Sequence, residues 1–189
     1  MAITLALSYK VSDDELLALS ERNPGYQFER TAKGEIIVTP TGLGSGGRSA
    51  EVVRQLGNWA EANRNGKAFD SSTGFRLPDG AVFAPDAAWV RRARLDALSP
   101  EQHKKFGPLC PDAVFEVRSE SNTLTELREK IRAYIANGAQ IAVLLDPEER
   151  VVEVHRPGRA PEVHRNPTTV ALDPELPGFV LDVAPIFAI

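Results

Sequence analysis

Residues 141–145 form a run of apolar side chains only, which Asp146 and Pro147 bring to an end. A strand that is apolar on both faces has to be covered on both faces, as happens when helices pack on each side of a sheet. The β-rich run at residues 151–155 follows after a short polar turn and predicts a hairpin with the first run. The sequence therefore predicts a sheet with helical cover.

Two capping boxes mark the beginnings of predicted helices. Ser12 is followed by Glu15, and Thr123 by Glu126, at the spacing in which each side chain of a pair binds the backbone N–H of the other residue. Apolar residues at helical spacing predict a further helix, in which Trp59 is assigned to the core. The predicted helices cover residues 12–21, 49–63, 99–105 and 123–137.

The predicted strands are β-rich runs bounded by glycine, proline and aspartate. Residues 41–47 are interpreted as a glycine-rich loop that has neither the P-loop ending nor the GxGxxG spacing of a nucleotide cradle. Mixed strands flanked by helices predict the α/β or α+β class, with one domain over residues 1–189. The predicted strands cover residues 26–30, 35–39, 68–72, 74–77, 81–90, 112–118, 141–145, 151–155 and 180–189.

Charge and composition narrow the function classes. A net charge of -4 argues against a protein that coats DNA through one broad basic face. No apolar run approaches the ~20 residues of a membrane span, and the first residues do not resemble a signal peptide. Cys110 is the single cysteine, so neither an intrachain disulfide nor a cysteine zinc cage is expected. We expect a cytoplasmic protein without a membrane partner.

Two predicted strands carry an acid where an apolar residue is expected. Asp86 lies within the run 81–90 and Glu116 within the run 112–118. A carboxylate that is buried without a partner is strongly disfavoured, so acids inside strands point to a metal ion or a basic neighbour. Mg²⁺ and similar hard cations take oxygen ligands, often one or two carboxylates. The two acids therefore predict a divalent-cation site.

Two cations are candidates for the neighbourhood of these acids. Strand alternation places Glu116 on the same side as Arg118, and helix geometry places Lys130 at the edge of an inward-facing helix surface. Each of these residues can also be explained without a role in function. Asp86 is equally a turn acid, Glu116 and Arg118 a surface pair, and Lys130 a lysine whose ammonium reaches water.

The order and spacing of several short motifs resemble the PD-(D/E)XK nuclease superfamily and, within it, the Uma-type restriction endonucleases. The resemblance runs nearly end to end. Its motifs are residues 28–38, 70–75, 84–86, 115–119, 138–140, 146–147 and 176–178, together with Lys130 and Tyr134. It implies a restriction-endonuclease-like mixed sheet flanked by helices, with an N-terminal helix and hairpin.

The resemblance also implies roles for single residues. Pro85 and Asp86 would be the PD element, Glu116 the acid of the second element, and Glu29 an acid from the N-terminal region. Arg118 stands where the superfamily lysine is expected, and Lys130 on the following helix takes the place of that lysine. Lysine can change its pKa when buried whereas arginine stays charged, so Lys130 is predicted to orient the attacking water.

The resulting hypothesis is a metal-dependent endonuclease acting on nucleic acid, most plausibly DNA, and forming a homodimer. Asp86, Glu116 and the Val117 carbonyl would hold Mg²⁺ or Mn²⁺, with 5′-phosphate and 3′-hydroxyl products. Arg118, Ser119 and Gln140 are the predicted substrate contacts. Two alternatives stay open: an inactive binding or regulatory protein with the nuclease fold, and a hydrolase using Asp86 and Glu116 as an acid/base pair, which leaves the two cations without a role.

Overall fold

The structure is a computed structural model that describes residues 2–40 and 42–188. Its central sheet has the strand order β11-β10-β9-β8-β7-β4, in which β8 and β9 are parallel and the other neighbours antiparallel. The predicted mixed sheet is therefore confirmed. The strands are β4 (Gly66–Asp70), β7 (Ala87–Arg91), β8 (Ala113–Val117), β9 (Ile141–Asp146), β10 (Val151–His155) and β11 (Glu162–Arg165).

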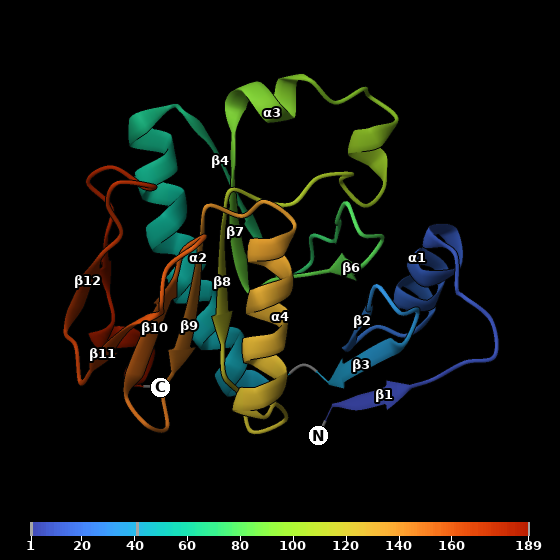
Figure 1. Cartoon of the computed structure of the whole chain (residues 1–189), viewed down its shortest axis with the longest axis horizontal. Helices are drawn as coiled ribbons and strands as arrows, with labels where there is room; N and C mark the ends of the chain where they lie inside the picture. The colour runs from blue at the N-terminus through green and yellow to red at the C-terminus, as the bar shows by residue number, and fades with distance from the viewer. Residues whose placement is uncertain (1, 41, 189) are drawn as a thin grey trace.

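Helices cover both faces of this sheet, as the apolar run of β9 requires (Figure 1). Helix α2 (Leu43–Asn63) and α5 (Ala184–Phe187) share one core with Ile141, Val143 and Leu145. The small sheet of β12 (Thr169–Ala171) and β13 (Val180–Asp182) completes that side. Helix α4 (Leu124–Ala136) packs on the opposite face, against Ala142 and Leu144.

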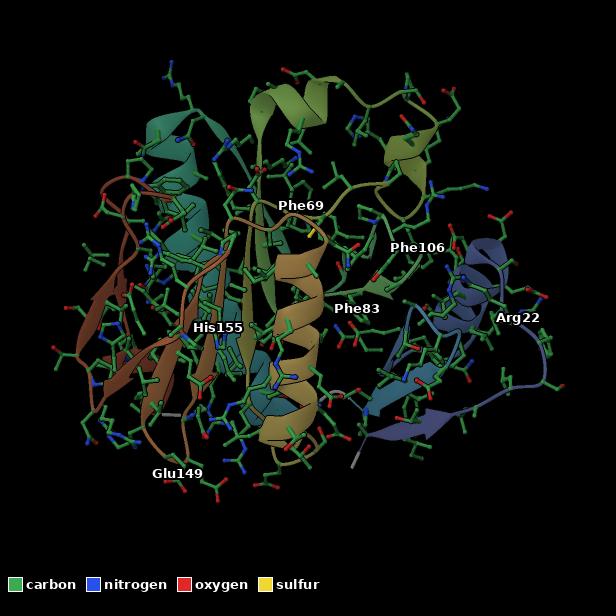
Figure 2. All side chains as sticks on the ribbon, viewed as in Figure 1. Arg22, Phe69, Phe83, Phe106, Glu149 and His155 are labelled. Carbon is green, nitrogen blue, oxygen red and sulfur yellow. The ribbon has the colours of Figure 1, made fainter. Side chains whose placement is uncertain are left out.

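A second, antiparallel sheet has the order β1-β3-β2-β6-β5 and stands beside α4 (Figure 1). Helix α1 (Asp13–Arg22) packs on it through the buried Leu16. Phe83 lies between this sheet and α4 (Figure 2), with its ring 5.5 Å from the Tyr134 ring. The strands are β1 (Ile3–Leu5), β2 (Tyr26–Arg30), β3 (Ile36–Pro40), β5 (Phe75–Arg76) and β6 (Val82–Phe83).

Several predicted elements are confirmed. Both capping boxes form, with Ser12 at the start of α1 and Thr123 at the start of α4. The hairpins β2–β3 and β9–β10 are present, and Trp59 is a core residue that is 9% exposed. These elements depend on local signals, which explains why the sequence was sufficient to predict them.

Other predictions were wrong. The glycine-rich stretch is helical from Leu43 onward. The Ser45 hydroxyl donates to the carbonyl of Gly42, the residue before the helix, and Ser49 contacts both the Ser45 carbonyl and Asp86. Residue 41 of that predicted loop lies outside the described residues. The predicted strand 81–90 is broken into β6 and β7 at Pro85, which has no N–H to donate to a ladder.

Near residue 100 and at the carboxyl end, the helices also differ from expectation. Only Gln102–Lys104 of the predicted helix 99–105 forms a short 3-10 turn, whereas α3 (Arg92–Asp96) was not predicted. The predicted strand 180–189 ends at Asp182, and α5 follows it with Pro185 in its first turn. No helix in the described ranges is long and apolar enough to cross a membrane.

Candidate active site

Asp86 is held at the point where three segments meet. It precedes β7, and because Ala87 pairs with Phe115 in antiparallel register, Asp86 and Glu116 lie at the same end of the β7–β8 ladder. Asp86 Oδ2 accepts a hydrogen bond of 2.8 Å from the Val117 N–H, and Oδ1 accepts one of 2.7 Å from the Ser49 hydroxyl of α2. The carboxylate is therefore fixed by backbone and side chain together.

Glu116 points toward α4, as strand alternation predicts. Its neighbours Phe115 and Val117 belong to the core on the α2 side of the sheet, so the side chain of Glu116 emerges on the other face. There the Tyr134 hydroxyl donates to Glu116 Oε1 over 3.2 Å. Glu116 is only 4% exposed, so its carboxylate depends on these neighbours in place of water.

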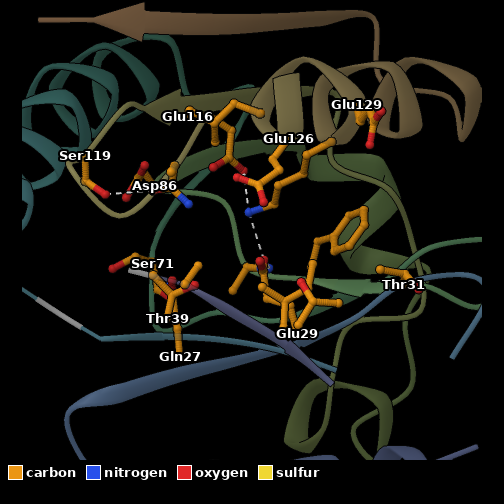
Figure 3. Close-up of a pocket in the computed structure, with 18 of the residues that line it drawn as sticks. Gln27, Glu29, Thr31, Thr39, Ser71, Asp86, Glu116, Ser119, Glu126 and Glu129 are labelled. Atoms are coloured by element: carbon orange, nitrogen blue, oxygen red, sulfur yellow. Dashed lines mark hydrogen bonds and ion pairs between the residues drawn. The ribbon is translucent and has the colours of Figure 1, made fainter. Parts of the chain in front are cut away.

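Lys130 of α4 bridges two carboxylates that come from different sheets. Its Nζ lies 2.8 Å from Glu116 Oε1 and 2.8 Å from Glu29 Oε1 of β2, and Figure 3 shows both ion pairs as dashed lines. The stem passes the Phe83 ring, whose centroid lies 5.6 Å from Nζ. With a side chain that is 13% exposed, Lys130 is directed inward and does not reach into open water.

Glu29 has a second partner in addition to Lys130. Its Oε1 accepts the Ala84 N–H at 2.6 Å, just after β6. Glu29 therefore ties the second sheet to the segment that leads into Asp86, and it holds Lys130 from the side opposite Glu116.

Asp86, Glu116, Glu29 and Lys130 line one pocket of about 450 Å³ (Figure 3). The walls come from β2 and β3 on one side and from α4 with the segment before it on the other. The wall residues include a surplus of acids over lysines. Beyond the four residues named above, the charged lining consists of Lys33, Glu35, Asp79, Glu126 and Glu129.

The buried charges of the pocket shift each other's titration. Burial raises the pKa of Glu116; the charge of Lys130 opposes this rise, and the charges of Asp86 and Glu29 add to it. Burial also raises the pKa of Asp86, against the lowering effect of its hydrogen bonds from Val117 and Ser49. Burial would lower the pKa of Lys130, but the charges of Glu116 and Glu29 outweigh it and raise that pKa. Lys130 is therefore an ammonium at neutral pH.

The donor set suits a hard divalent cation. Asp86 and Glu116 present carboxylate oxygens, and the three carboxylates of Glu29, Asp86 and Glu116 face the single ammonium of Lys130. When all three carboxylates are ionised, two negative charges remain in excess, which is the charge that one Mg²⁺ neutralises. Within the described ranges, no group of three or more His, Cys, Asp or Glu side chains is arranged to hold a metal. Glu29 pairs with Lys130.

Of the remaining predicted site residues, some line the pocket and others lie outside it. Val117 and Ser119 line the pocket, and the Ser119 hydroxyl lies 2.7 Å from both Ser121 Oγ and Asn122 Oδ1. Arg118, expected near Glu116 or a phosphate, instead pairs with Asp146 at 3.0 Å and with Glu148 at 3.1 Å.

Gln140 is also placed away from the acids. Its side-chain amide donates to the Gly138 carbonyl over 2.9 Å and is exposed beyond the end of α4. Neither Arg118 nor Gln140 is among the described residues that line the pocket.

Two residues that hold the acids were not predicted as site residues. Ser49 was assigned to a helix end, and Tyr134 to an apolar helix face. Ser49 lies seven residues before Leu56, so helical periodicity places it on the buried face, where a polar side chain calls for a partner. That spacing is the signal that could have identified Ser49.

Comparisons with known proteins agree with the fold. A family model described as "Uma2: Putative restriction endonuclease" matches residues 13–184. A crystal structure of a putative nuclease belonging to DUF820 from Anabaena variabilis superposes with a TM-score of 0.74 at 21% identity, over 93% of this chain and 96% of that one. A comparison with curated proteins finds no significant match.

Proposed function

This chain belongs to the Uma2 family of restriction-endonuclease-like proteins, and from that membership we propose that it is a divalent-metal-dependent endonuclease that hydrolyses phosphodiester bonds of nucleic acid. One observation carries the proposal: Lys130 Nζ lies 2.8 Å from both Glu116 and Glu29 in the pocket that Asp86 also lines. An ammonium next to acids that line the same pocket suits the recognition of an anion in the presence of a cation.

Asp86 and Glu116, with the Val117 carbonyl, would hold Mg²⁺ or Mn²⁺ in this proposal. A bound ion of this kind lowers the pKa of water and neutralises phosphate charge. The Val117 N–H and the Ser49 hydroxyl keep Asp86 in place, and Tyr134 does the same for Glu116. The protein thus fixes both acids before a substrate arrives.

Lys130 acts as a hydrogen-bond donor in this mechanism. Its raised pKa keeps all three protons on Nζ, so it cannot accept a proton from water. Two of its N–H groups face Glu29 and Glu116, which leaves the third, as far as the described residues go, for the attacking water or a phosphate oxygen. The water oxygen forms the new bond to phosphorus and the bond between phosphorus and O3′ breaks. The attacking water releases one proton to solvent and O3′ takes one from solvent, so the protons balance and the products are a 5′-phosphate and a 3′-hydroxyl.

The test is a cleavage assay on a panel of DNA and RNA oligonucleotides with Mg²⁺, Mn²⁺ or EDTA. We expect cleavage with the metals, none with EDTA, and a loss of at least about a hundredfold in Asp86→Ala and Lys130→Ala. Asp96→Ala and Lys104→Ala, which alter exposed residues outside the pocket, are the matched controls. Unchanged cleavage by the pocket variants would refute the assignment.

Metal titration by calorimetry separates this function from its main alternative, an inactive binding protein with the same fold. The proposed enzyme binds Mg²⁺ or Mn²⁺ with heat that Asp86→Ala abolishes, whereas an inactive protein need not bind either ion there. The homodimer and the cytoplasmic location stay predictions from the sequence.

A further inference from the structure

Several contacts join the two walls of the pocket. At one end, the Ala2 N–H, just before β1, donates to the Ser121 carbonyl in the segment before α4 over 3.1 Å. At another point, the Gln27 side chain of β2 donates to the Ser71 carbonyl, just after β4, over 2.7 Å. Each bond connects the second sheet with the half of the molecule that contains the central sheet.

Two further links join the same walls. Asn137, at the end of α4, accepts the Asp79 N–H at 3.0 Å and donates to Asp79 Oδ2 at 2.8 Å. The fourth link is the ion pair between Glu29 and Lys130 inside the pocket. Moving the two walls apart therefore requires breaking several hydrogen bonds at once, so the pocket differs from an open cleft between hinged lobes.

The proposed reacting groups are buried side chains at the bottom of a partly open pocket. The side chains of Glu116 and Glu29 are 5% and 7% exposed. A volume of about 450 Å³ falls in the range that takes small ligands. A base-paired duplex keeps its phosphates on the outside of a wide, stiff rod, whereas an unpaired nucleotide can turn out of the stack and enter a pocket.

The charge of the pocket lining also argues against a duplex as the substrate. A protein that binds a duplex neutralises many phosphates with lysine and arginine. The lining here instead presents Glu35, Asp79, Glu126 and Glu129 next to a single additional lysine, Lys33. An acidic lining repels a long row of phosphates far more than it repels one or two phosphates of a short flexible segment.

We infer that the substrate of the proposed hydrolysis is an unpaired strand: a single strand, or a bulge or loop within a duplex. The inference rests on the proposed function and refines it, because burial and the links between the walls restrict which phosphates reach Lys130. Cleavage within a fully paired duplex would require either base pairs to open or the two walls to separate.

The first experiment compares one sequence in three forms with the purified protein and Mn²⁺: single strand, perfect duplex, and duplex with an unpaired internal loop. Each base-pair step that opens costs about tenfold, so two steps predict a kcat/KM for the single strand about a hundredfold above that for the duplex. The looped duplex should be cut within the loop. Equal or faster cleavage of the perfect duplex would overturn the inference while leaving the nuclease function intact.

A binding measurement keeps the inference testable if nothing is cleaved. Fluorescence anisotropy with Ca²⁺ in place of Mn²⁺ compares the same single strand and duplex. Tighter binding of the single strand supports the inference even if the proposed hydrolysis fails, and tighter binding of the duplex overturns it.

The second experiment removes links between the two walls directly. Ala2→Pro removes the N–H that reaches Ser121, and Gln27→Ala removes the bond to Ser71. We expect the double variant to narrow the preference for single strand from about a hundredfold to about tenfold. Gln55→Ala, which breaks a similar glutamine bond to Asp182 outside the pocket, should leave the preference unchanged. An unaltered preference in the double variant would show that the links do not exclude the duplex.

Discussion

Ser49 and Asp86 share a hydrogen bond of 2.7 Å that joins α2 to the segment before β7. The Ser49 oxygen also lies 2.9 Å from the Ser45 carbonyl oxygen, but a serine has a single hydroxyl proton. When Asp86 is charged, the Ser49 proton can point to only one of the two oxygens, and the other contact then places two oxygens side by side with no proton between them. When Asp86 is protonated, its O–H donates to Ser49 and Ser49 donates to Ser45. Protonation of Asp86 would therefore end the competition for the Ser49 proton, and burial raises the pKa of Asp86 in the same direction.

Replacing Asp86 by asparagine should stabilise the metal-free protein. The asparagine amide can donate to Ser49 and its oxygen can accept the Val117 N–H, so the hydrogen bonds persist without a buried charge. We expect the free energy of unfolding in urea with EDTA to rise by about 1 to 2 kcal/mol, while Mg²⁺-dependent cleavage is lost. Asp96→Asn, at an exposed position, should change stability by less than about 0.5 kcal/mol. A less stable Asp86→Asn variant would contradict this account.

The stability difference between Asp86→Asn and the wild type should depend on pH. A carboxyl whose pKa is raised on folding binds its proton more tightly in the folded state than in the unfolded state. Its contribution to the free energy of unfolding is therefore fully present below the ordinary pKa and is lost as the pH rises through the raised pKa. Burial raises the pKa of Asp86 in this way. The stability advantage of Asp86→Asn over the wild type in EDTA should therefore grow from about pH 4 toward neutral pH.

Added Mg²⁺ should offset the stability that the wild type loses as the pH rises. The ion binds the deprotonated carboxylates, so the rise in melting temperature that it causes in the wild type should increase with pH and be absent in Asp86→Asn. A shift that is independent of pH, or that is the same in both proteins, would place metal binding elsewhere.

Local rules were sufficient to predict the directions of two side chains that line the pocket. The Thr123 capping box fixes where α4 begins and hence which way Lys130 faces, and strand alternation fixes the face of Glu116. The contact between Arg118 and Asp146 was not predicted, because Asp146 lies at the end of β9 and pairing between β8 and β9 is a long-range relationship that spacing does not reveal.

The helical start of α2 was missed for a related reason. Glycine and serine favour loops when judged one residue at a time, and the helix instead receives support from tertiary contacts such as the bond from Ser49 to Asp86. Strand β1, for which no prediction was made, likewise depends on pairing with the distant β3. The local sequence pattern does not reveal which distant segment each of these elements contacts.

Lys130 offers a test of whether its role is donation or proton transfer. Lys130→Met leaves Glu116 and Glu29 without their shared cation, and removing one partner of a buried pair typically costs about 3 to 5 kcal/mol. Lys130→Arg keeps a charged donor. We expect cleavage to fall at least about a hundredfold in Lys130→Met and less in Lys130→Arg. Equal loss in both variants would favour a proton-transfer role for Lys130.

A double variant separates stability from chemistry at this position. Glu29→Gln combined with Lys130→Met removes one of the two stranded charges, so part of the lost free energy of unfolding should return while cleavage stays low. Urea unfolding of the single and double variants measures the coupling. If the two losses simply add, the ion pair between Glu29 and Lys130 contributes little.

Glu129 tests the acidic lining of the pocket, since it is exposed on α4 and lines the pocket wall. Glu129→Lys replaces a repulsive charge by an attractive one in the pocket lining. We expect single-strand binding in Ca²⁺ to tighten several-fold, with a salt dependence that is steeper by somewhat less than one unit of slope if one more phosphate is neutralised. Glu101→Lys makes the same charge change at an exposed residue outside the pocket lining. Because both variants change the net charge equally, equal tightening would mean that overall charge, and not the pocket, governs binding.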